Sequence, residues 1–282
     1  MAPLLPHHGV EKFNQEAPAK EYFGRALKAA ALEPQPIGFY SRGCLAGATP
    51  LAADGPNWQA MRPSRNRNWG HPEMIRFIER FAPAAASASG WPGLLVGDIA
   101  QPRGGPMLTG HASHQLGLDA DIWLKPMPMQ RLTTSEREEV SSIKVVRADR
   151  LDIDPAIWTT AHQAVLRTAA LDPQVQRIFV NAAIKRAMCR SAKGEPWLQK
   201  IRPEQGHDYH FHVRLLCPEG AGKCSPQDPT PEGDGCDETL EAWFTEEALH
   251  PKPPSQPPVP LTLVKLPLEC RAVLNAGDSS RR

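Results

Sequence analysis

Residues 116–124, LGLDADIWL, alternate between apolar and polar side chains, and this two-residue period predicts a strand with one buried face. Asp119 and Asp121 would point together from the other face of that strand. His114 precedes Asp121 by seven residues, so a continuous strand would turn these two side chains to opposite faces. Gly117 lies between them and can supply the turn that brings His114 back, because glycine tolerates a left-handed backbone at little cost.

The same period recurs in residues 209–217, YHFHVRLLC, and predicts a second half-buried strand. On that strand His210 and His212 share one face, and the apolar residues between and after them share the other. His207 stands just before the strand. Five of the ten histidines fall in the two short segments around these strands, which makes the segments the best candidates for chemistry.

Helix signals surround the two strands. Asp154 and Pro155 have the residue types of a helix start, and Ser135 and Glu138 have the spacing of a capping box. The pattern predicts helices over 20–32, 71–87, 133–139, 154–173 and 182–189, and further strands over 93–99 and 175–181.

This order of elements predicts an α+β fold, in which helices flank a central, mostly antiparallel sheet of one domain. We expect residues 1–35 to be a polar lead-in and residues 36–245 to form the domain. Residues 246–282 are rich in proline and would form a C-terminal tail that covers the domain and is pinned to it by a disulfide at Cys270.

Composition narrows the range of partners. The chain has 282 residues, 41% of them hydrophobic, and a formal net charge of +1, so a disordered chain is excluded and nucleic acid is not an expected partner. No run approaches the ~20 apolar residues of a membrane span. The residues carry no signal for an oligomeric state.

The six cysteines are spread along the chain without a CxxC pair, which favours disulfides over a zinc ribbon. Spacing alone does not choose among the possible pairings. Disulfides imply an exported protein, although the first twenty residues lack the apolar core of a signal peptide.

The histidines and aspartates predict a metal site. If the two predicted strands are neighbours, a carboxylate and two imidazoles converge on one face. Three nitrogen and oxygen ligands with one open position are typical of catalytic zinc, whereas structural zinc sites are usually four-coordinate and rich in cysteine. A further histidine beside the metal could then accept a proton. We expect His71, His162 and His250 to be structural or exposed, as well as His7 and His8.

The motif SHQLGLDAD followed by a downstream HxH resembles the zinc peptidases related to lysostaphin, the D-Ala-D-Ala carboxypeptidases and the hedgehog domain. More narrowly, the stretches GGPMLTGHASHQLGLDADIWL, RIFVNAAIK, GHDYHFHVRLLCP and GDGC resemble the penicillin-insensitive murein endopeptidases. The similarity covers roughly residues 36–245. It implies a periplasmic enzyme that uses Zn²⁺ to cut the D-alanyl–meso-diaminopimelyl amide crosslinks between peptidoglycan stem peptides.

The resemblance also implies roles for single residues. His114, Asp121 and His212 would be the core zinc ligands, His111 a further histidine at the metal, and His210 and His207 catalytic residues. Asp149 can occupy an acidic position of the family pattern and would then be a further metal-site residue, but Asp152 stands where that pattern has a histidine. The implied disulfides are Cys44–Cys270, Cys189–Cys236 and Cys217–Cys224.

Two other functions fit parts of the sequence. SSIK at 141–144 and SRN at 64–66 spell fragments of a serine acyl-enzyme motif, but their order is reversed and no KTG follows. A peptidoglycan-binding module without activity is the other alternative, because a fold does not guarantee catalysis.

Overall fold

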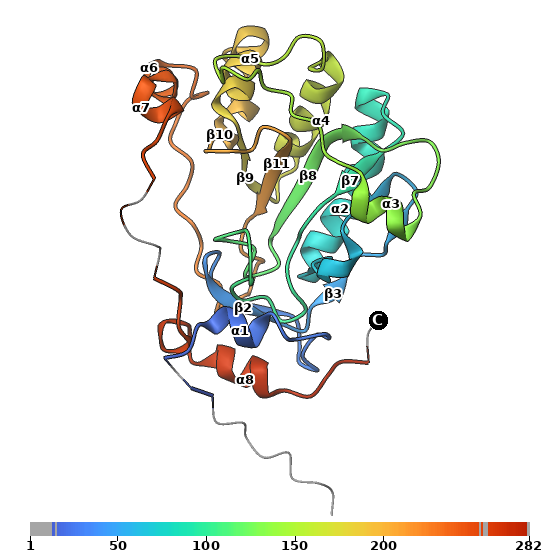
Figure 1. Cartoon of the computed structure of the whole chain (residues 1–282), viewed down its shortest axis with the longest axis vertical. Helices are drawn as coiled ribbons and strands as arrows, with labels where there is room; N and C mark the ends of the chain where they lie inside the picture. Colours follow the sequence, from blue (N-terminus) through green and yellow to red (C-terminus); the bar gives the residue numbers. More distant parts are fainter. Residues whose placement is uncertain (1–12, 15, 254, 256–258, 281–282) are drawn as a thin grey trace, which may run out of the picture.

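The computed structural model describes residues 13–14, 16–253, 255 and 259–280. Within them the largest sheet has seven strands in the order β10-β9-β11-β8-β7-β5-β4 (Figure 1). Only the pairs β9–β10 and β5–β7 are parallel, which confirms the predicted, mostly antiparallel sheet of an α+β domain. The strands are β4 (Asp54–Gly55), β5 (Trp58–Ala60), β7 (Leu94–Val96), β8 (Asp119–Pro126), β9 (Val175–Val180), β10 (Ile201–Pro203) and β11 (His210–Leu215).

Helices α2 (Pro72–Ser89) and α4 (Thr160–Leu171) pack against each other and cover one face of this sheet (Figure 1). Phe81 of α2 and Phe211 of β11 lie edge to face, with ring centroids 6.5 Å apart. The remaining helices are α1 (Ala19–Phe23), α3 (Thr134–Glu139), α5 (Ala182–Ala192), α6 (Glu238–Glu241), α7 (Glu246–Leu249) and α8 (Glu269–Asn275), and 3₁₀ turns span Pro63–Arg65, Pro196–Lys200, Ala242–Phe244 and Leu263–Lys265.

The alternation of β8 and β11 divides the sheet into an apolar face and a polar face, as predicted. The side chains of Ala120, Ile122, Phe211 and Val213 belong to the main core. The polar face carries the aspartates of β8 and the histidines of β11, which pair antiparallel so that His212 lies opposite Asp121. Because the apolar side chains fix which face is buried, they also fix where the polar side chains point.

The start and the end of the described chain form a second apolar cluster. Strands β1 (Gln35–Phe39) and β2 (Arg42–Ala46) form a hairpin, and α1, α8 and β2 lie together at one end of the molecule (Figure 1). Strands β3 (Thr49–Pro50) and β6 (Trp69–Gly70) pair nearby. Cys44–Cys270 joins β2 to α8, and Cys189–Cys236 and Cys217–Cys224 complete the pairing that the family resemblance implied.

Helix α4 begins later than the sequence predicts. Asp154 accepts a hydrogen bond from Ala156 N, but this closes a single turn, and the helix starts only at Thr160. His162 sets that start: its Nδ1 accepts the Thr159 N–H, and its Nε2 donates to Leu124 O on β8. The expectation of a structural role for His162 is therefore confirmed.

Two smaller predictions about helices are also wrong. Helix α3 is capped two residues earlier than expected, because Thr133 and Glu136, rather than Ser135 and Glu138, exchange the capping-box hydrogen bonds. The helix expected over 20–32 is limited to Ala19–Phe23, and Gly24 ends it. His7 and His8 lie outside the described residues.

His71 caps α2 and makes stability depend on pH. Its Nδ1 accepts the Glu73 N–H, and burial lowers the pKa of its side chain to about 4. The folded state then binds fewer protons than the unfolded state between pH 4 and 6.5, so acid favours unfolding in that window. We expect metal-free wild-type protein to lose about 2 kcal/mol more stability between pH 7 and pH 4.5 than His71→Asn, measured by urea unfolding. Asparagine still caps the helix but does not titrate. Parallel losses in the two proteins would contradict this role.

Candidate metal centre

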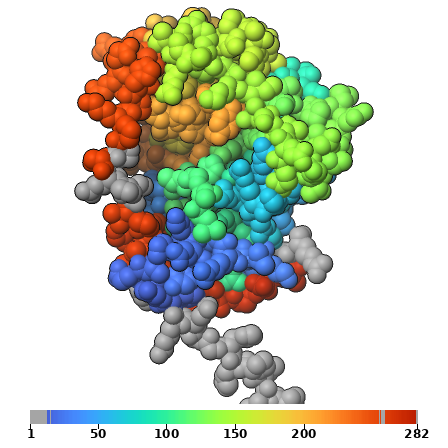
Figure 2. All heavy atoms as spheres, in the orientation of Figure 1, coloured from blue at the N-terminus to red at the C-terminus, as the bar shows by residue number. Residues whose placement is uncertain are grey.

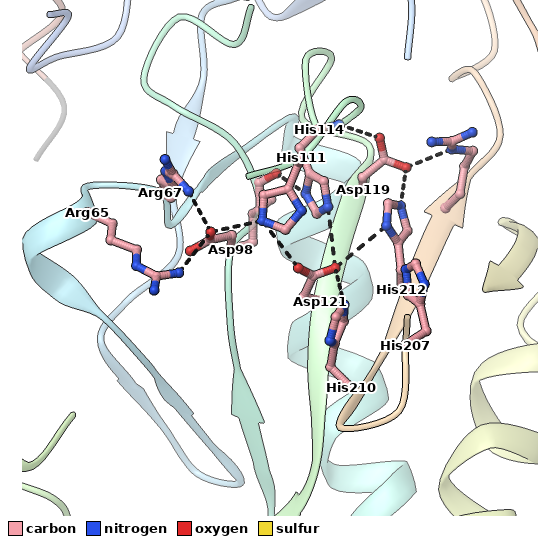
Figure 3. Close-up of polar contacts among 12 residues, drawn as sticks. Arg65, Arg67, Asp98, His111, His114, Asp119, Asp121, His207, His210 and His212 are labelled. Atoms are coloured by element: carbon pink, nitrogen blue, oxygen red, sulfur yellow. Dashed lines mark hydrogen bonds and ion pairs between the residues drawn. The ribbon is translucent and has the colours of Figure 1, made fainter. Parts of the chain in front are cut away.

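Three imidazoles converge on one carboxylate oxygen on the polar face of the sheet (Figure 3). Asp121 Oδ1 lies 3.3 Å from His114 Nε2, 3.6 Å from His210 Nε2 and 3.6 Å from His212 Nδ1. Asp121, His210 and His212 come from the neighbouring strands β8 and β11, and His114 comes from the loop before β8.

Backbone conformation brings His114 to this point. His114 and Gly117 both have positive φ, 65° and 66°, so the loop before β8 is left-handed at two positions. A Cβ at Gly117 would lie 2.5 Å from Leu45 Cδ2 and 2.7 Å from His71 N, so only glycine fits there. The turn predicted at Gly117 is therefore present. The left-handed His114 is a strained position of the kind found at functional sites.

Two of the imidazoles are each oriented by a hydrogen bond from the ring nitrogen that does not face Asp121. His114 Nδ1 donates to Ile99 O at 2.7 Å, so Nε2 is the nitrogen that faces Asp121. His212 Nε2 donates to Asp119 Oδ1 at 2.8 Å, which leaves the lone pair on Nδ1 facing the same carboxylate. Metal-binding histidines typically have one nitrogen on the metal and the other held by an oxygen acceptor.

Asp119 is the fully buried partner of these groups. Its Oδ1 also accepts from Arg214 Nε at 2.7 Å, and its Oδ2 accepts from His114 N at 3.0 Å. Burial alone would raise the pKa of Asp119, but Arg214 and His212 outweigh burial and hold the pKa far below its usual value. The carboxylate is therefore ionised and fixes both the loop before β8 and the ring of His212.

The donor set fits a metal ion. In the described part of the chain, His114 Nε2, Asp121 Oδ1 and His210 Nδ1 are among the few buried side-chain atoms without a hydrogen-bond partner. Two ligand atoms about 2.1 Å from a tetrahedral zinc ion are about 3.4 Å apart, which is close to the separations observed here. Ligand atoms of His111, His114 and Asp121 all lie within 4.8 Å of one another, so these residues form a group that can hold a metal.

The charges at this point also favour a cation. Burial would raise the pKa of Asp121, but the neighbouring His114 and His210 hold it well below its usual value. Burial opposes the charged form of His114, yet the Asp121 carboxylate raises the pKa of this histidine to about 9. Burial lowers the pKa of His212 to about 4 and also lowers the pKa of His210, so both imidazoles are neutral near pH 7. His114 is therefore protonated near pH 7 without a metal, and a divalent ion would have to displace its proton. Three neutral imidazoles would then surround an ionised carboxylate, which is a usual ligand set for such an ion.

His111 and His207 lie beside the convergent group. His111 Nε2 is 3.0 Å from Asp98 Oδ2 and 3.5 Å from Asp121 Oδ2, so it is shared between two carboxylates. The ring of His207 lies 4.9 Å from that of His210, and its Nδ1 donates to Gln205 O. His207 has a positive φ of 50°, like His114. All five predicted histidines and Asp121 therefore gather at one place.

Two cavities flank the centre. The larger, about 460 Å³, contains His207 and His212 together with Glu204 and Gln205. Figure 2 shows this face of the molecule, where orange-coloured residues lie recessed between green and red segments. The smaller, about 190 Å³, adjoins Asp121 from the side of Asp98. A chain lying across the metal centre can thus extend into a cavity on each side.

A comparison with known families decides which protein class carries this centre. Residues 36–275 match the model of the family described as penicillin-insensitive murein endopeptidase. The chain belongs to the penicillin-insensitive murein endopeptidase family. The predicted resemblance is thereby confirmed, and the match extends beyond the expected residues 36–245 to include α8.

Curated relatives agree with this membership. The chain is 45% identical over 244 residues to the penicillin-insensitive murein endopeptidase of Haemophilus influenzae, which covers 86% of the chain and 83% of the relative. It is 42% identical to that of Yersinia enterocolitica and 41% identical to that of Klebsiella pneumoniae, in both cases over 86% of each sequence. The family is one of peptidases, so the chain is a hydrolase of the murein endopeptidase class.

Among the residues predicted for the metal, Asp149 lies elsewhere. Its carboxylate binds the Arg147 guanidinium and accepts from Leu151 N in an exposed turn. Asp152, the residue at the expected histidine position, pairs with Arg190. In the described residues neither aspartate contacts the histidines of the candidate centre. His250 is exposed, as expected, and His71 is a structural cap.

Sequence reasoning missed Asp98. It follows β7 as a single aspartate in GDI, where nothing in the local pattern marks it. In the fold it is nearly fully buried and contacts His111, Arg67 and Arg65. Hydrogen bonds from His111 and Arg67 outweigh its burial and lower the pKa of Asp98 to about 2. Arg65 and Arg67 belong to the arginine-rich stretch MRPSRNRNW at 61–69, and Asp98 pairs with both of them.

The serine acyl-enzyme alternative finds no support in the geometry. Lys144 pairs with Asp208, and Ser64 Oγ donates to Glu138. In the described part of the chain no hydrogen bond joins Ser141 to Lys144.

Across the same described residues, no helix has both the length and the apolar character to cross a membrane.

Proposed function

We propose that this protein is a zinc-dependent murein endopeptidase that hydrolyses D-alanyl–meso-diaminopimelyl crosslinks between peptidoglycan stem peptides. One observation carries the proposal: three imidazole nitrogens surround Asp121 Oδ1 at 3.3–3.6 Å within a family of murein endopeptidases. The three disulfides favour an oxidising compartment, and we propose the periplasm.

His114, Asp121 and His212 would hold the zinc ion. Both imidazoles have their second nitrogen fixed by an oxygen acceptor, and the side chains of all three residues are almost completely buried. His111 is more exposed, and its Nε2 is already engaged by Asp98, so we place it beside the ion as an additional metal-site residue. We leave Asp149 out of the ligand set because Arg147 occupies its carboxylate.

A zinc ion held there would polarise the scissile carbonyl and lower the pKa of a water molecule to about 7. The neutral His210 lies on the same face, with its Nε2 3.6 Å from Asp121 Oδ1, and would accept the proton of the attacking water. His207, whose ring is next to that of His210, would hold the leaving amino group or pass a proton to it. Hydrolysis breaks the amide C–N bond, adds hydroxyl to the D-alanyl carbonyl and adds a proton to the amine.

A direct assay tests the proposal. Purified protein is incubated with crosslinked muropeptide dimers, and the monomers released are measured by chromatography. We expect cleavage that is lost to background after EDTA treatment, restored by one equivalent of Zn²⁺ and unchanged by penicillin. Zinc binding without monomer release would instead indicate a peptidoglycan-binding module, and cleavage that resists the chelator would exclude the metal mechanism.

A further inference from the structure

We propose that the smaller cavity is a carboxylate-binding subsite, which recognises the free carboxylate that the crosslink carries next to its scissile amide. We call it the arginine pocket: the cavity of about 190 Å³ that contains Arg62, Arg65, Ser142 and Tyr209 beside Asp98 and Asp121. The inference rests on the proposed function and specifies how the substrate is oriented.

Arg65 has spare hydrogen-bonding capacity. Its side chain is 49% exposed and makes one ion pair in the described structure, 3.3 Å from Nη1 to Asp98 Oδ2. The same oxygen lies 2.9 Å from Arg67 Nη1 and 3.0 Å from His111 Nε2 (Figure 3). One carboxylate therefore faces two guanidinium groups and an imidazole, so Asp98 alone does not neutralise both arginines.

Arg62 adds to this charge. Its guanidinium donates to the main-chain carbonyls of Arg137 and Val140, and no carboxylate pairs with it among the described residues. Those carbonyls fix the side chain without neutralising it. A fixed cation beside a half-exposed cation attracts an anion more strongly than two mobile surface cations would, because less side-chain entropy is lost on binding.

Neutral donors complete the arginine pocket. The hydroxyls of Tyr209 and Ser142 have no hydrogen-bond partner in the part of the chain that the structure describes, and the ring of Tyr209 lies 4.5 Å from that of His210. Guanidinium groups and hydroxyls together suit the two planar oxygens of a carboxylate, and Arg in particular can bind both at once.

The chemistry of the crosslink supplies such a group. The scissile amide joins the D-alanyl carbonyl to an amino group of diaminopimelate, and the carbon that bears this amino group also bears a free carboxylate. The carboxylate is thus two bonds from the leaving nitrogen. The arginine pocket adjoins Asp121, which we propose as a zinc ligand, so it lies where this carboxylate would be when the amide is at the metal.

The opposite cavity does not suit an anion. Glu204 contributes a carboxylate that makes no ion pair among the described residues, whereas Asp98 in the arginine pocket faces two guanidinium groups. The cation of Arg214 is already bound to Asp119 and Gln227. Repulsion from Glu204 would disfavour the carboxylate side of the crosslink. We therefore infer that the diaminopimelyl side of the amide enters the arginine pocket and that the D-alanyl side enters the larger cavity.

Paired substrates and matched variants test this orientation. Two muropeptide dimers are used that differ only at this group, one with the free carboxylate and one with a carboxamide. We expect zinc-loaded wild-type protein to favour the carboxylate dimer in kcat/KM by about 10- to 100-fold, the usual range for a charge-assisted hydrogen bond. In Arg65→Gln the ratio should fall to near one, and in Arg65→Lys it should be intermediate. Arg76→Gln, which removes an exposed arginine of α2 paired with Glu73, should keep the wild-type ratio.

A second readout does not require turnover. Calorimetry measures the affinity of metal-free protein for two monomer products, one with the free carboxylate and one with the carboxamide. Wild type should bind the carboxylate product more tightly, and Arg65→Gln should lose this preference. A wild-type ratio near one overturns the subsite. So does an Arg65→Gln variant that loses activity equally on both dimers, because that result places its effect on Asp98 and His111. If neither dimer is cleaved by zinc-loaded wild type, the proposed function fails and the subsite fails with it.

Discussion

Replacing His114 by alanine should abolish both zinc binding and crosslink cleavage. The change removes one of three proposed ligands and leaves Asp121 with a buried cavity in place of the imidazole that lies 3.3 Å from it. Loss of the metal removes several kcal/mol of transition-state stabilisation, so we expect kcat/KM to fall by about 1000-fold or more. Two quantities are measured on the same samples. Mass spectrometry gives the zinc content, and chromatography gives the monomers released from crosslinked dimers.

His250→Ala is the matched control for this experiment. The His250 side chain is 71% exposed and lies 3.8 Å from Glu246 at the surface, so its removal should leave zinc content and turnover at the wild-type level. Wild-type turnover in His114→Ala would rule out the proposed ligand set. His114 and Asp121 could share the zinc ion with either His212 or His111. A comparison of His111→Ala with His212→Ala separates these two ligand sets, and we expect the larger loss of zinc from His212→Ala.

Replacing Asp119 by asparagine should weaken the metal site and the fold together. Three donors point at this carboxylate, from His114 N, His212 Nε2 and Arg214 Nε. An asparagine of the same shape must turn its NH₂ group, itself a donor, towards at least one of them, and it leaves the buried Arg214 without a counter-charge. We expect a loss of about 3 kcal/mol in the free energy of unfolding and a 10- to 100-fold weaker affinity for zinc.

Urea unfolding of the metal-free protein and competition with a zinc chelator measure the two effects separately. Asp149→Asn makes the same chemical change at an exposed aspartate, so it should alter neither quantity appreciably. If Asp119→Asn binds zinc as tightly as wild type, Asp119 does not orient His212. If Asp149→Asn loses zinc, our exclusion of Asp149 from the site is wrong.

The sequence predicted well which side chains of β8 and β11 share a face, because successive side chains of a strand alternate between only two faces. Once the apolar positions of β8 and β11 are buried, Asp121 and His212 must project from the other face. The register that sets His212 opposite Asp121 was not predictable, since it depends on how the two strands align in the sheet. The turn at Gly117 was predictable, because few other residues tolerate its backbone.

Contacts between distant segments explain what was missed. Asp98 becomes part of the site only when β7 pairs with β8 and when the loop carrying Arg65 and Arg67 packs beside it. The start of α4 depends on a hydrogen bond from His162 to Leu124 on another strand, which a local Asp-Pro signal does not contain. Asp149 matched a family position by spacing, but its neighbour Arg147 determines where its carboxylate points.

The disulfide between Cys44 and Cys270 determines what happens when a protease cuts the chain once. These cysteines are 226 positions apart, so the bond closes most of the polypeptide into a ring. A single protease cut anywhere within that ring, for example at the exposed residues 251–253 after α7, leaves two fragments that remain covalently attached. On a gel the nicked protein would migrate as one band until a reducing agent separates it into two.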